Sequence, residues 1–268
     1  MTQAQWRKAW HALLFWLGTM ALLVVVSIAS HELPLPWQVG INGAGGAVLA
    51  WGLSRLFLRW DRLAPTDARL VPDARSLARL LCGLVAGAAL ACLFVGLLWL
   101  SGLVEFRPAT SPDVASSLAL VAAGFLLLAT REEIAFRGYL LHTLETGFGR
   151  WPALLAMAVL FAIEHALSGG SLANVVLGAV PGALVFGMAA LASRSLAFPI
   201  GLHGAWNMVD WATGGKGGAG LWQRVVATGA EDHVQAAALL LYVVVMGLAL
   251  IALSRFAARA AKGAGDAN

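Results

Sequence analysis

Eight long apolar runs fill most of this chain of 268 residues and leave it few ways to fold. A helix needs about 20 mainly apolar residues to cross a bilayer. Backbone groups in lipid must be hydrogen-bonded within the protein, so runs this long are expected to be helices. The sequence predicts an all-α polytopic membrane protein with about eight transmembrane helices and a single integral membrane domain over residues 1–268. The expected spans are Leu13–Ala29, Trp37–Leu58, Leu77–Leu100, Val114–Leu141, Trp151–Leu167, Leu172–Ala192, Ser195–Trp211 and Val234–Leu253.

The composition supports a membrane protein and argues against a nucleic-acid-binding one. Sixty per cent of the residues are apolar and only 12% are charged, whereas soluble domains carry about 25% charged residues. The net charge is +4, but the basic residues lie in the gaps between apolar runs rather than along one stripe. Anionic lipid headgroups are the simpler counter-charge, so we expect the lipid bilayer as a partner and no nucleic acid.

The positions of the basic residues predict the orientation in the membrane. Arg7 and Lys8 precede the first run, five arginines lie between residues 59 and 79, and Arg255, Arg259 and Lys262 follow the last run. The loop over residues 31–36 has no lysine or arginine. Cytoplasmic loops are enriched in these residues, so both termini are expected to be cytoplasmic. Pro181 should kink the sixth span, the Gly-rich stretch 213–220 should be an extracytoplasmic loop, and residues 260–268 should form a disordered tail.

The fourth run contains charged residues in the middle of apolar sequence. Glu132 and Glu133 are adjacent, and Arg137 follows one turn after Glu133. Ionisable groups at membrane depth are costly and mark functional sites. Residues four apart share a helical face, so Glu133 and Arg137 can pair while Glu132 points elsewhere and could act as a general base. The alternative is a structural ion pair with Glu132 facing interfacial water.

Two later runs each contribute a histidine. His165 ends the stretch Phe161-Ala162-Ile163-Glu164-His165, and His203 is followed one turn later by Asn207. An imidazole and a carboxamide on one face could hold a water or an oxyanion. A lone histidine in a membrane helix is more often a hydrogen-bonded packing residue. Asp210 shares this face but lies near a helix end, where an acid can stay solvated.

Taken together, these groups resemble the motifs of a known family. Glu132 to Gly138, Phe161 to His165, and His203 to Asn207 occur in this order on separate runs. The pattern resembles the CPBP family of intramembrane proteases, the type II CAAX prenyl endopeptidase and bacteriocin-processing group, with a core over residues 114–211. The resemblance implies an eight-helix core around a membrane-embedded cavity, and hydrolysis of a peptide bond near the cytoplasmic face. The implied catalytic residues are Glu132, Glu133, Arg137, His165, His203 and Asn207.

The resemblance also implies roles for these residues. Glu132 would activate the attacking water, Glu133 and Arg137 would orient the site, and His165 would help to hold the water. His203 and Asn207 would stabilise the oxyanion, which is the step where preorganised donors matter most. Glu164 and Asp210 lie outside the motifs and could contact the catalytic residues without touching the substrate. The substrate would be a membrane-associated, lipidated or CAAX-like peptide that enters from the membrane.

The sequence leaves metal dependence and function class open. Glu132, His165 and His203 could supply three ligands to zinc and leave a position for water, yet no His-Glu-x-x-His helix presents two histidines together. We favour a metal-free mechanism with no certain cofactor. The rival functions are a non-catalytic membrane scaffold or immunity-type protein of the same fold, and a proton-coupled transporter. The resemblance and composition predict a multi-pass protein of a bacterial inner membrane.

The depth in the membrane that we expect for Glu132 conflicts with the depth that we expect for His165. Glu132 should lie close to the cytoplasmic end of the fourth span, whereas His165 falls late in the fifth span, which runs outward. The two side chains can meet only if residues 140–150 extend toward the cytoplasm and the fifth span begins below the interface.

Overall fold

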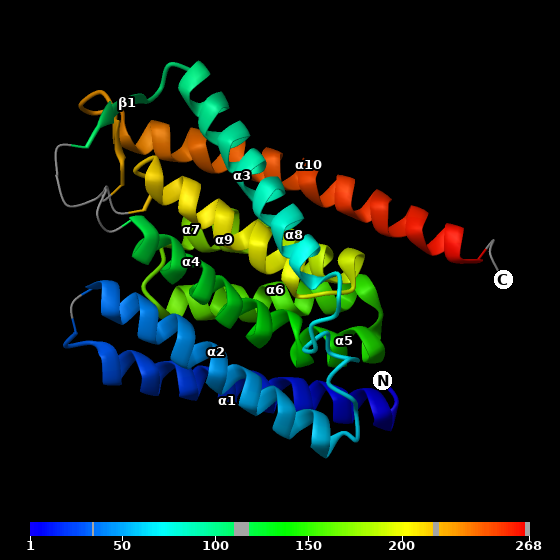
Figure 1. Ribbon diagram of the computed structural model, residues 1–268. Helices are drawn as coiled ribbons and strands as arrows, with labels where there is room; N and C mark the ends of the chain where they lie inside the picture. The colour runs from blue at the N-terminus through cyan, green and yellow to red at the C-terminus, as the bar shows by residue number, and fades with distance from the viewer. Residues whose placement is uncertain (34, 110–117, 217–219, 266–268) are drawn as a thin grey trace.

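The computed structural model describes residues 1–33, 35–109, 118–216 and 220–265, and these residues are mostly helical (Figure 1). The helical elements are α1 (Gln3–Ser30), α2 (Leu35–Trp60), α3 (Ser76–Leu100), α4 (Leu118–Glu132), η1 (Glu133–Arg137), α5 (Tyr139–Phe148), α6 (Arg150–Leu167), α7 (Leu172–Asn174), η2 (Val175–Ala179), α8 (Val180–Ser193), α9 (Ala197–Ala212) and α10 (Glu231–Gly265). The expectation of an all-α polytopic membrane protein is confirmed.

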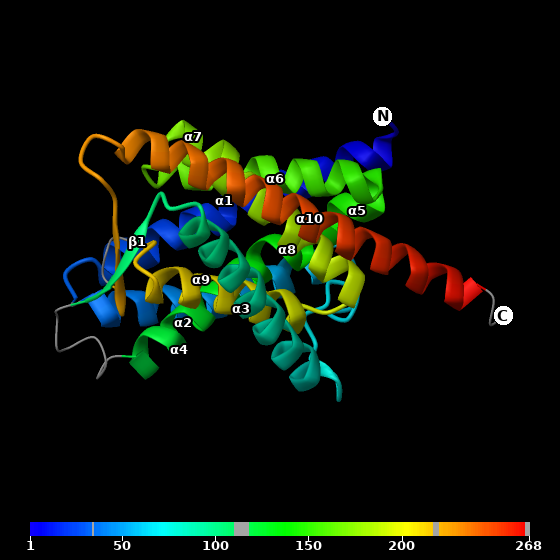
Figure 2. The same cartoon turned by 90° about the horizontal axis from the view of Figure 1, so that it is seen from above.

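The chain runs back and forth between two ends of a helical bundle. Both termini lie at one end, which we call the terminal end, together with the loop 61–75 and the turns at Gly149 and Arg194 (Figures 1 and 2). The opposite end, which we call the ribbon end, carries two short strands, β1 (Glu105–Pro108) and β2 (Trp222–Val225), and the turns at 168–171 and 213–216. This alternation agrees with eight passes.

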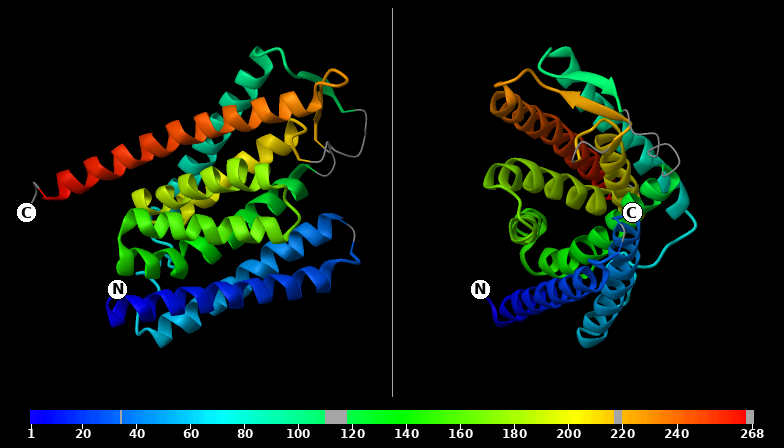
Figure 3. Two further views of the ribbon diagram at one scale, coloured as in Figure 1. Left: turned by 180° about the vertical axis from the view of Figure 1, so that it is seen from behind. Right: turned by 90° about the vertical axis from the view of Figure 1, so that its left-hand side faces the viewer.

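The helices form a stack whose middle contains the family motifs. From one side of the bundle to the other, α1 and α2 come first, α4, α5 and α6 follow, then α8 and α9, and finally α3 and α10 (Figures 1 and 3). The glutamates end α4 and begin η1, His165 lies on α6 and His203 on α9. The candidate residues are therefore carried by the inner helices, with other helices on both sides.

Five helices are long and apolar enough to cross a membrane on their own in the described part of the chain: Gln3–Ser30, Ser76–Leu100, Arg150–Leu167, Leu172–Ser193 and Glu231–Ala260. The other expected spans are also helical, but each differs from an ideal span. The helix α2 contains Gln38, Asn42 and Arg55, while α4 and α9 have only 15 and 16 residues. The exact number of spans stays a prediction.

The fourth expected span, Val114–Leu141, is not one continuous α-helix. It begins at Leu118 in the described residues, and positions 114–117 lie outside them. The α-helix gives way to a π-helical segment at Glu133 and is broken at Gly138, whose ψ is −117°. A separate helix, α5, then extends to Phe148. The expected ion pair across one turn therefore sits in a π-helical segment, a feature that often occurs at functional sites.

The sixth span and the C-terminus also differ in detail from expectation. The sixth span contains a second π-helical segment, Val175–Ala179, directly before α8, and Pro181 occupies the first turn of α8. At the C-terminus, α10 continues to Gly265, so an unstructured tail does not begin at residue 260. Residues 266–268 lie outside the described part.

The ribbon of β1 and β2 was not expected from the sequence. The two strands pair antiparallel, with Glu105 opposite Val225 and Pro108 opposite Trp222. Each strand has four residues and stands apart from the apolar runs. Pairing of this kind depends on contacts between distant segments, so short polar stretches such as these give little sequence signal. The ribbon brings Arg224 next to the end of α9.

Candidate active site

Glu133 and Arg137 form a fully buried ion pair inside η1. Arg137 Nη1 lies 3.3 Å from Glu133 Oε1, and neither side chain has any exposed surface. The Nη2 atom of Arg137 also donates to the carbonyl oxygen of Ala183 on α8, at 3.3 Å. The predicted pairing of these two residues is therefore present, and it also connects η1 to α8.

The guanidinium of Arg137 is surrounded by aromatic rings. It lies over Phe161 at 4.9 Å, and over Phe136 and Phe186 at 5.8 and 5.7 Å. The electron-rich faces of these rings attract a cation that has lost its hydration. Arg137 Nε and Glu133 Oε2 are nevertheless buried without a hydrogen-bond partner among the described residues. A charge pair held this deeply fixes the position of the Glu133 carboxylate.

His203 lies between the two glutamates. Its Nδ1 is 2.9 Å from Glu133 Oε1, and its Nε2 is 3.7 Å from Glu132 Oε2. An ionised carboxylate can only accept, so Nδ1 carries the proton in the contact with Glu133. In the neutral ring, Nε2 is then an acceptor that faces Glu132. The ring stacks on Phe186 at 4.3 Å with an interplanar angle of 15°.

The backbone of α9 is held in place by close contact with α3. A Cβ atom added at Gly83 would collide with the carbonyl oxygen of Phe198, and one at Gly87 with that of Leu202. On α9, a Cβ at Gly201 would collide with the carbonyl oxygen of Leu80. Small residues allow such close helix packing in membranes. Because Leu202 precedes His203, this contact sets where the imidazole lies.

Arg131 and Glu164 extend the polar cluster from α4 to α6. Arg131 Nη2 donates to Glu132 Oε1 at 2.9 Å and lies 4.0 Å from Glu164 Oε1. Arg131 had no assigned role in the sequence, although it belongs to the same polar run as Glu132. Its neighbour across the helices, Glu164, was named as a residue that could support the site. Arg131 links both acids, so it neutralises part of the charge beside Glu132.

His165 joins the cluster through an aromatic ring. Its Nδ1 donates to the carbonyl oxygen of Phe161 at 3.0 Å, and the two rings lie 4.3 Å apart. Phe161 in turn packs edge-to-face on Phe136 at 5.0 Å. With Nδ1 protonated, the neutral ring presents Nε2 as an acceptor. The carbonyl contact therefore fixes the tautomer of His165.

The expected conflict in depth between Glu132 and His165 is resolved by α5. Glu132 lies 17 residues before the turn at Gly149, and His165 lies 16 residues after it. The helix α5 and this turn extend toward the terminal end, as the sequence argument required (Figure 1). Because the helical stretches before and after Gly149 have nearly equal lengths, Glu132 and His165 lie at the same depth in the bundle. The contacts of Arg131 with Glu132 and Glu164 agree with this.

Asn207 and Asp210 take different places on α9. Asn207 is partly buried one turn beyond His203. Asp210 Oδ1 accepts a hydrogen bond from Arg224 Nη2 at 2.7 Å, so this acid is paired with the ribbon and not with the histidine. The sequence could not identify this pair, because Arg224 lies on a strand that was not expected.

The candidate zinc ligands are not gathered as a metal site. No group of three His, Cys, Asp or Glu side chains that could hold a metal ion occurs in residues 1–33, 35–109, 118–216 and 220–265. Glu133 already engages His203 Nδ1, and Glu132 lies 3.7 Å from His203 Nε2. Metal dependence therefore stays a question for experiment.

Comparison with known protein families agrees with the residues of this site. Residues 114–209 match the family described as type II CAAX prenyl endopeptidase Rce1-like. This segment is Rce1-like. The match includes α4, η1, α6 and most of α9, and it confirms the resemblance to CPBP-type intramembrane proteases. A comparison with curated proteins found no match. The Rce1-like segment thus carries Glu132, Glu133, Arg137, His165, His203 and Asn207.

Proposed function

We propose that this protein is an intramembrane endopeptidase that hydrolyses a peptide bond of a membrane-associated substrate. The observation that carries the proposal is the position of the His203 imidazole between the carboxylates of Glu132 and Glu133. One carboxylate fixes the ring, and the other faces its second nitrogen. The Rce1-like match supports a CAAX-endopeptidase type of protease. What we say about metal dependence and about the substrate is likewise part of this proposal.

In the proposed mechanism, Glu132 acts as the general base. A water held between Glu132 and His203 Nε2 transfers a proton to Glu132 as its oxygen attacks the scissile carbonyl. The 3.7 Å between these groups is longer than a direct hydrogen bond, so both can contact one water. Glu132 then delivers the proton to the leaving amine. General base catalysis of this kind is worth roughly 10²–10⁴-fold in rate.

The other residues position this pair or stabilise the charge that develops. Glu133 keeps the proton of His203 on Nδ1, and Arg137 balances the charge of Glu133. Both are positioning residues. His165, whose Nε2 is an acceptor, helps to hold the water. Asn207 and the protonated form of His203, in which both ring nitrogens donate, stabilise the oxyanion, since donors fixed in a water-poor site act strongly on a developing charge. No metal ion is part of this mechanism.

The decisive experiment is cleavage of a quenched reporter peptide by the purified protein in liposomes. Glu132→Gln should abolish cleavage while the protein keeps its thermal stability and elution volume. Glu32→Gln is the matched control, because the side chain of Glu32 is 87% exposed on a loop. Normal turnover by Glu132→Gln would eliminate the general-base role. A transporter would instead move protons in the same liposomes, and a scaffold would do neither.

The physiological substrate is expected among peptides of a bacterial inner membrane. We propose a lipidated or otherwise membrane-associated peptide as the substrate, with no nucleic-acid partner. Mass spectrometry of membrane peptides from cells with the wild-type protein and with Glu132→Ala tests this. A product that ends at one site and is lost in the variant gives the substrate and the bond together.

A further inference from the structure

Both oxygens of the Glu132 carboxylate have a neighbour. Oε2 lies 3.7 Å from His203 Nε2, and Oε1 accepts a hydrogen bond of 2.9 Å from Arg131 Nη2. The terminal torsion of a glutamate has a broad, roughly two-fold profile, so a carboxylate without a second contact can turn easily. The hydrogen bond from Arg131 limits this rotation and keeps Oε2 on the side of the imidazole.

The contact between Arg131 and Glu132 needs help from another helix. The two residues are adjacent at the end of α4, and neighbouring side chains on a helix point about 100° apart. On α2, a Cβ atom added at Gly46 would lie 2.6 Å from Arg131 Cδ and 2.9 Å from its Cγ. The stem of Arg131 therefore lies against the bare backbone of Gly46, and α2 sets the path of this side chain.

Glu164 on α6 confines the guanidinium from a third helix. Its Oε1 lies 4.0 Å from Arg131 Nη2, the same nitrogen that donates to Glu132. The side chains of Arg131 and Glu132 are each 15% exposed, and that of Glu164 is 13% exposed. Charges that are largely buried are screened much less than charges at the surface. The cation is therefore held between α2, α4 and α6, and it is hydrogen-bonded to Glu132.

We propose that Arg131 is a positioning residue of the candidate active site. Its stem lies on Gly46, and its guanidinium holds Glu132 Oε1 so that Oε2 keeps facing His203 Nε2. The proposal rests on the proposed protease function and adds to it a residue outside the motifs. Position matters here because a displacement of about 1 Å can cost about 10²-fold in rate. In this role Arg131 acts through Glu132 and does not touch the reacting atoms.

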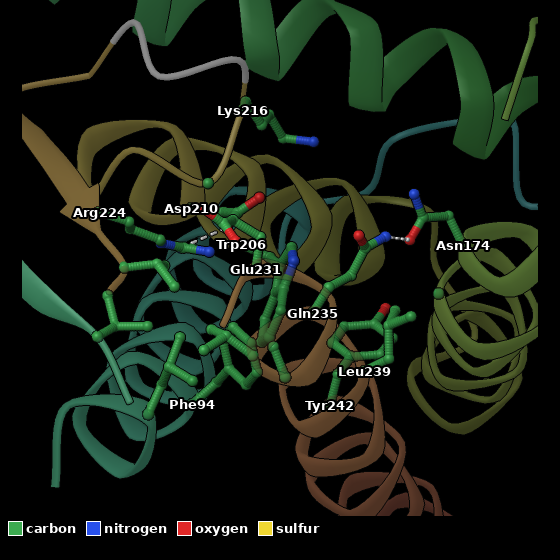
Figure 4. A pocket seen from close by; sticks show the side chains of 17 residues that line it. Phe94, Asn174, Trp206, Asp210, Lys216, Arg224, Glu231, Gln235, Leu239 and Tyr242 are labelled. Atoms are coloured by element: carbon green, nitrogen blue, oxygen red, sulfur yellow. Dashed lines mark hydrogen bonds and ion pairs between the residues drawn. The ribbon is translucent and has the colours of Figure 1, made fainter. Parts of the chain in front are cut away.

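A second arginine–acid pair of similar burial lies outside the site and provides a matched control. Arg224 Nη2 donates to Asp210 Oδ1 at 2.7 Å, and both side chains are 19% exposed. Figure 4 shows this pair at a cavity of about 560 Å³ between α3, α9, α10 and η2. Among the described residues, the lining of this cavity includes none of the candidate catalytic residues. Loss of Arg224 therefore removes a comparable ion pair without touching Glu132.

Steady-state cleavage of the reporter peptide tests the role of Arg131. Arg131→Met should lower kcat by about 10²-fold and leave KM nearly unchanged, because the affected group is the base and not a substrate contact. Arg131→Lys should keep more of the turnover, since an ammonium can still donate to Oε1. Arg224→Met should keep a kcat near that of the wild type. Normal turnover by Arg131→Met, or an equal loss in Arg224→Met, would overturn the proposal.

Substitution of Gly46 separates the position of the cation from its charge. Gly46→Ala keeps the charge of Arg131 but displaces its stem, so kcat should fall. In an Arg131→Ala background the same substitution should cause no further loss, because no stem remains to be displaced. The added Cβ also lies 3.3 Å from Leu23 Cδ2, and a loss that persists without the arginine would assign the effect to this packing and reject the proposal. Gly52→Ala, on the same helix with no heavy atom within 4 Å, should have no effect.

Thermal unfolding in detergent tests the same contacts without any need for activity. Gly46→Ala should lower the unfolding temperature when Arg131 is present and not in the Arg131→Ala background. The effects of Arg131→Met and Glu132→Gln should be non-additive in the double variant, as expected for residues in contact. Additive effects in both comparisons would overturn the proposal. If even the wild-type protein cleaves nothing, the proposed protease function fails, and these comparisons still decide whether Arg131 holds Glu132.

Discussion

His203 Nδ1 and Glu133 Oε1 lie 2.9 Å apart although their residues are 70 positions apart in the sequence. This contact joins α9 to the π-helical segment η1 and leaves the second nitrogen of the imidazole facing Glu132. Two adjacent glutamates therefore have different tasks. Glu133 is fully buried and paired with Arg137, while Glu132 is partly exposed and faces His203 Nε2. The following predictions depend on this difference.

Removal of the buried cation should destabilise the protein. Arg137→Met keeps a similar volume but leaves the Glu133 carboxylate buried without its partner, which costs about 3–5 kcal/mol in comparable buried pairs. We expect a lower thermal unfolding temperature in detergent. Adding Glu133→Gln to Arg137→Met should recover part of the loss, because the unpaired charge is gone. Arg107→Met is the control, since Arg107 is 65% exposed. Equal stability of all these variants would argue against the ion pair.

Loss of the imidazole should reduce cleavage more than stability. His203→Gln can still accept or donate a hydrogen bond but cannot bridge both carboxylates. Removal of one oxyanion donor costs roughly 10²–10³-fold in turnover, and we expect a loss of at least this size in the reporter-peptide assay. His31→Gln, at a 69% exposed side chain, should behave as wild type. Near-normal turnover of His203→Gln would exclude a role for His203 at the reacting atoms.

The close contact between α3 and α9 predicts that two glycine-to-alanine substitutions on α3 have different effects. Gly87→Ala pushes a methyl group against the carbonyl oxygen of Leu202, whereas Gly96→Ala has no heavy atom within 4 Å. Overpacking of this kind costs typically about 1–3 kcal/mol. Gly87→Ala should lower both thermal stability and cleavage because α9 carries His203. Gly96→Ala should be neutral or slightly stabilising, since alanine favours helices. Similar behaviour of the two variants would contradict the role assigned to α3.

Chelators should leave the activity unchanged. The mechanism that we propose uses Glu132 and His203 to activate water and needs no metal ion. Purified active protein treated with a strong zinc chelator should cleave the reporter peptide at the original rate, and metal analysis provides the control. Stoichiometric zinc in the active protein, with loss of activity on its removal and recovery on its return, would reverse this prediction.

The class of fold and much of the polar cluster could be predicted from the sequence. Apolar runs of span length require helices in lipid, and the pairing of Glu133 with Arg137 follows from helical periodicity. His203 could be connected with the glutamates only through the order of the motifs, because residues on different helices have no fixed spacing. The same motifs led us to His165, and the turn at Gly149 explains why its depth matches that of Glu132.

Other features of the site depend on contacts that no local pattern reveals. In the π-helical segment Glu133–Arg137, Arg137 contacts α8 and Glu133 contacts α9. The bridge from Arg131 to Glu164 requires α4 and α6 to lie side by side. The pair of Asp210 with Arg224 requires the ribbon of β1 and β2. Each of these joins distant segments, which explains why the sequence did not predict them.

The backbone contact between α3 and α9 has a consequence for where this protein can be cut. The Rce1-like match covers residues 114–209 and omits α3 entirely. A fragment trimmed to those limits would keep every motif residue but lose the surface against which Gly201 and Leu202 rest. The smallest active piece of the molecule must therefore begin upstream of Ser76, well outside the region that sequence similarity marks.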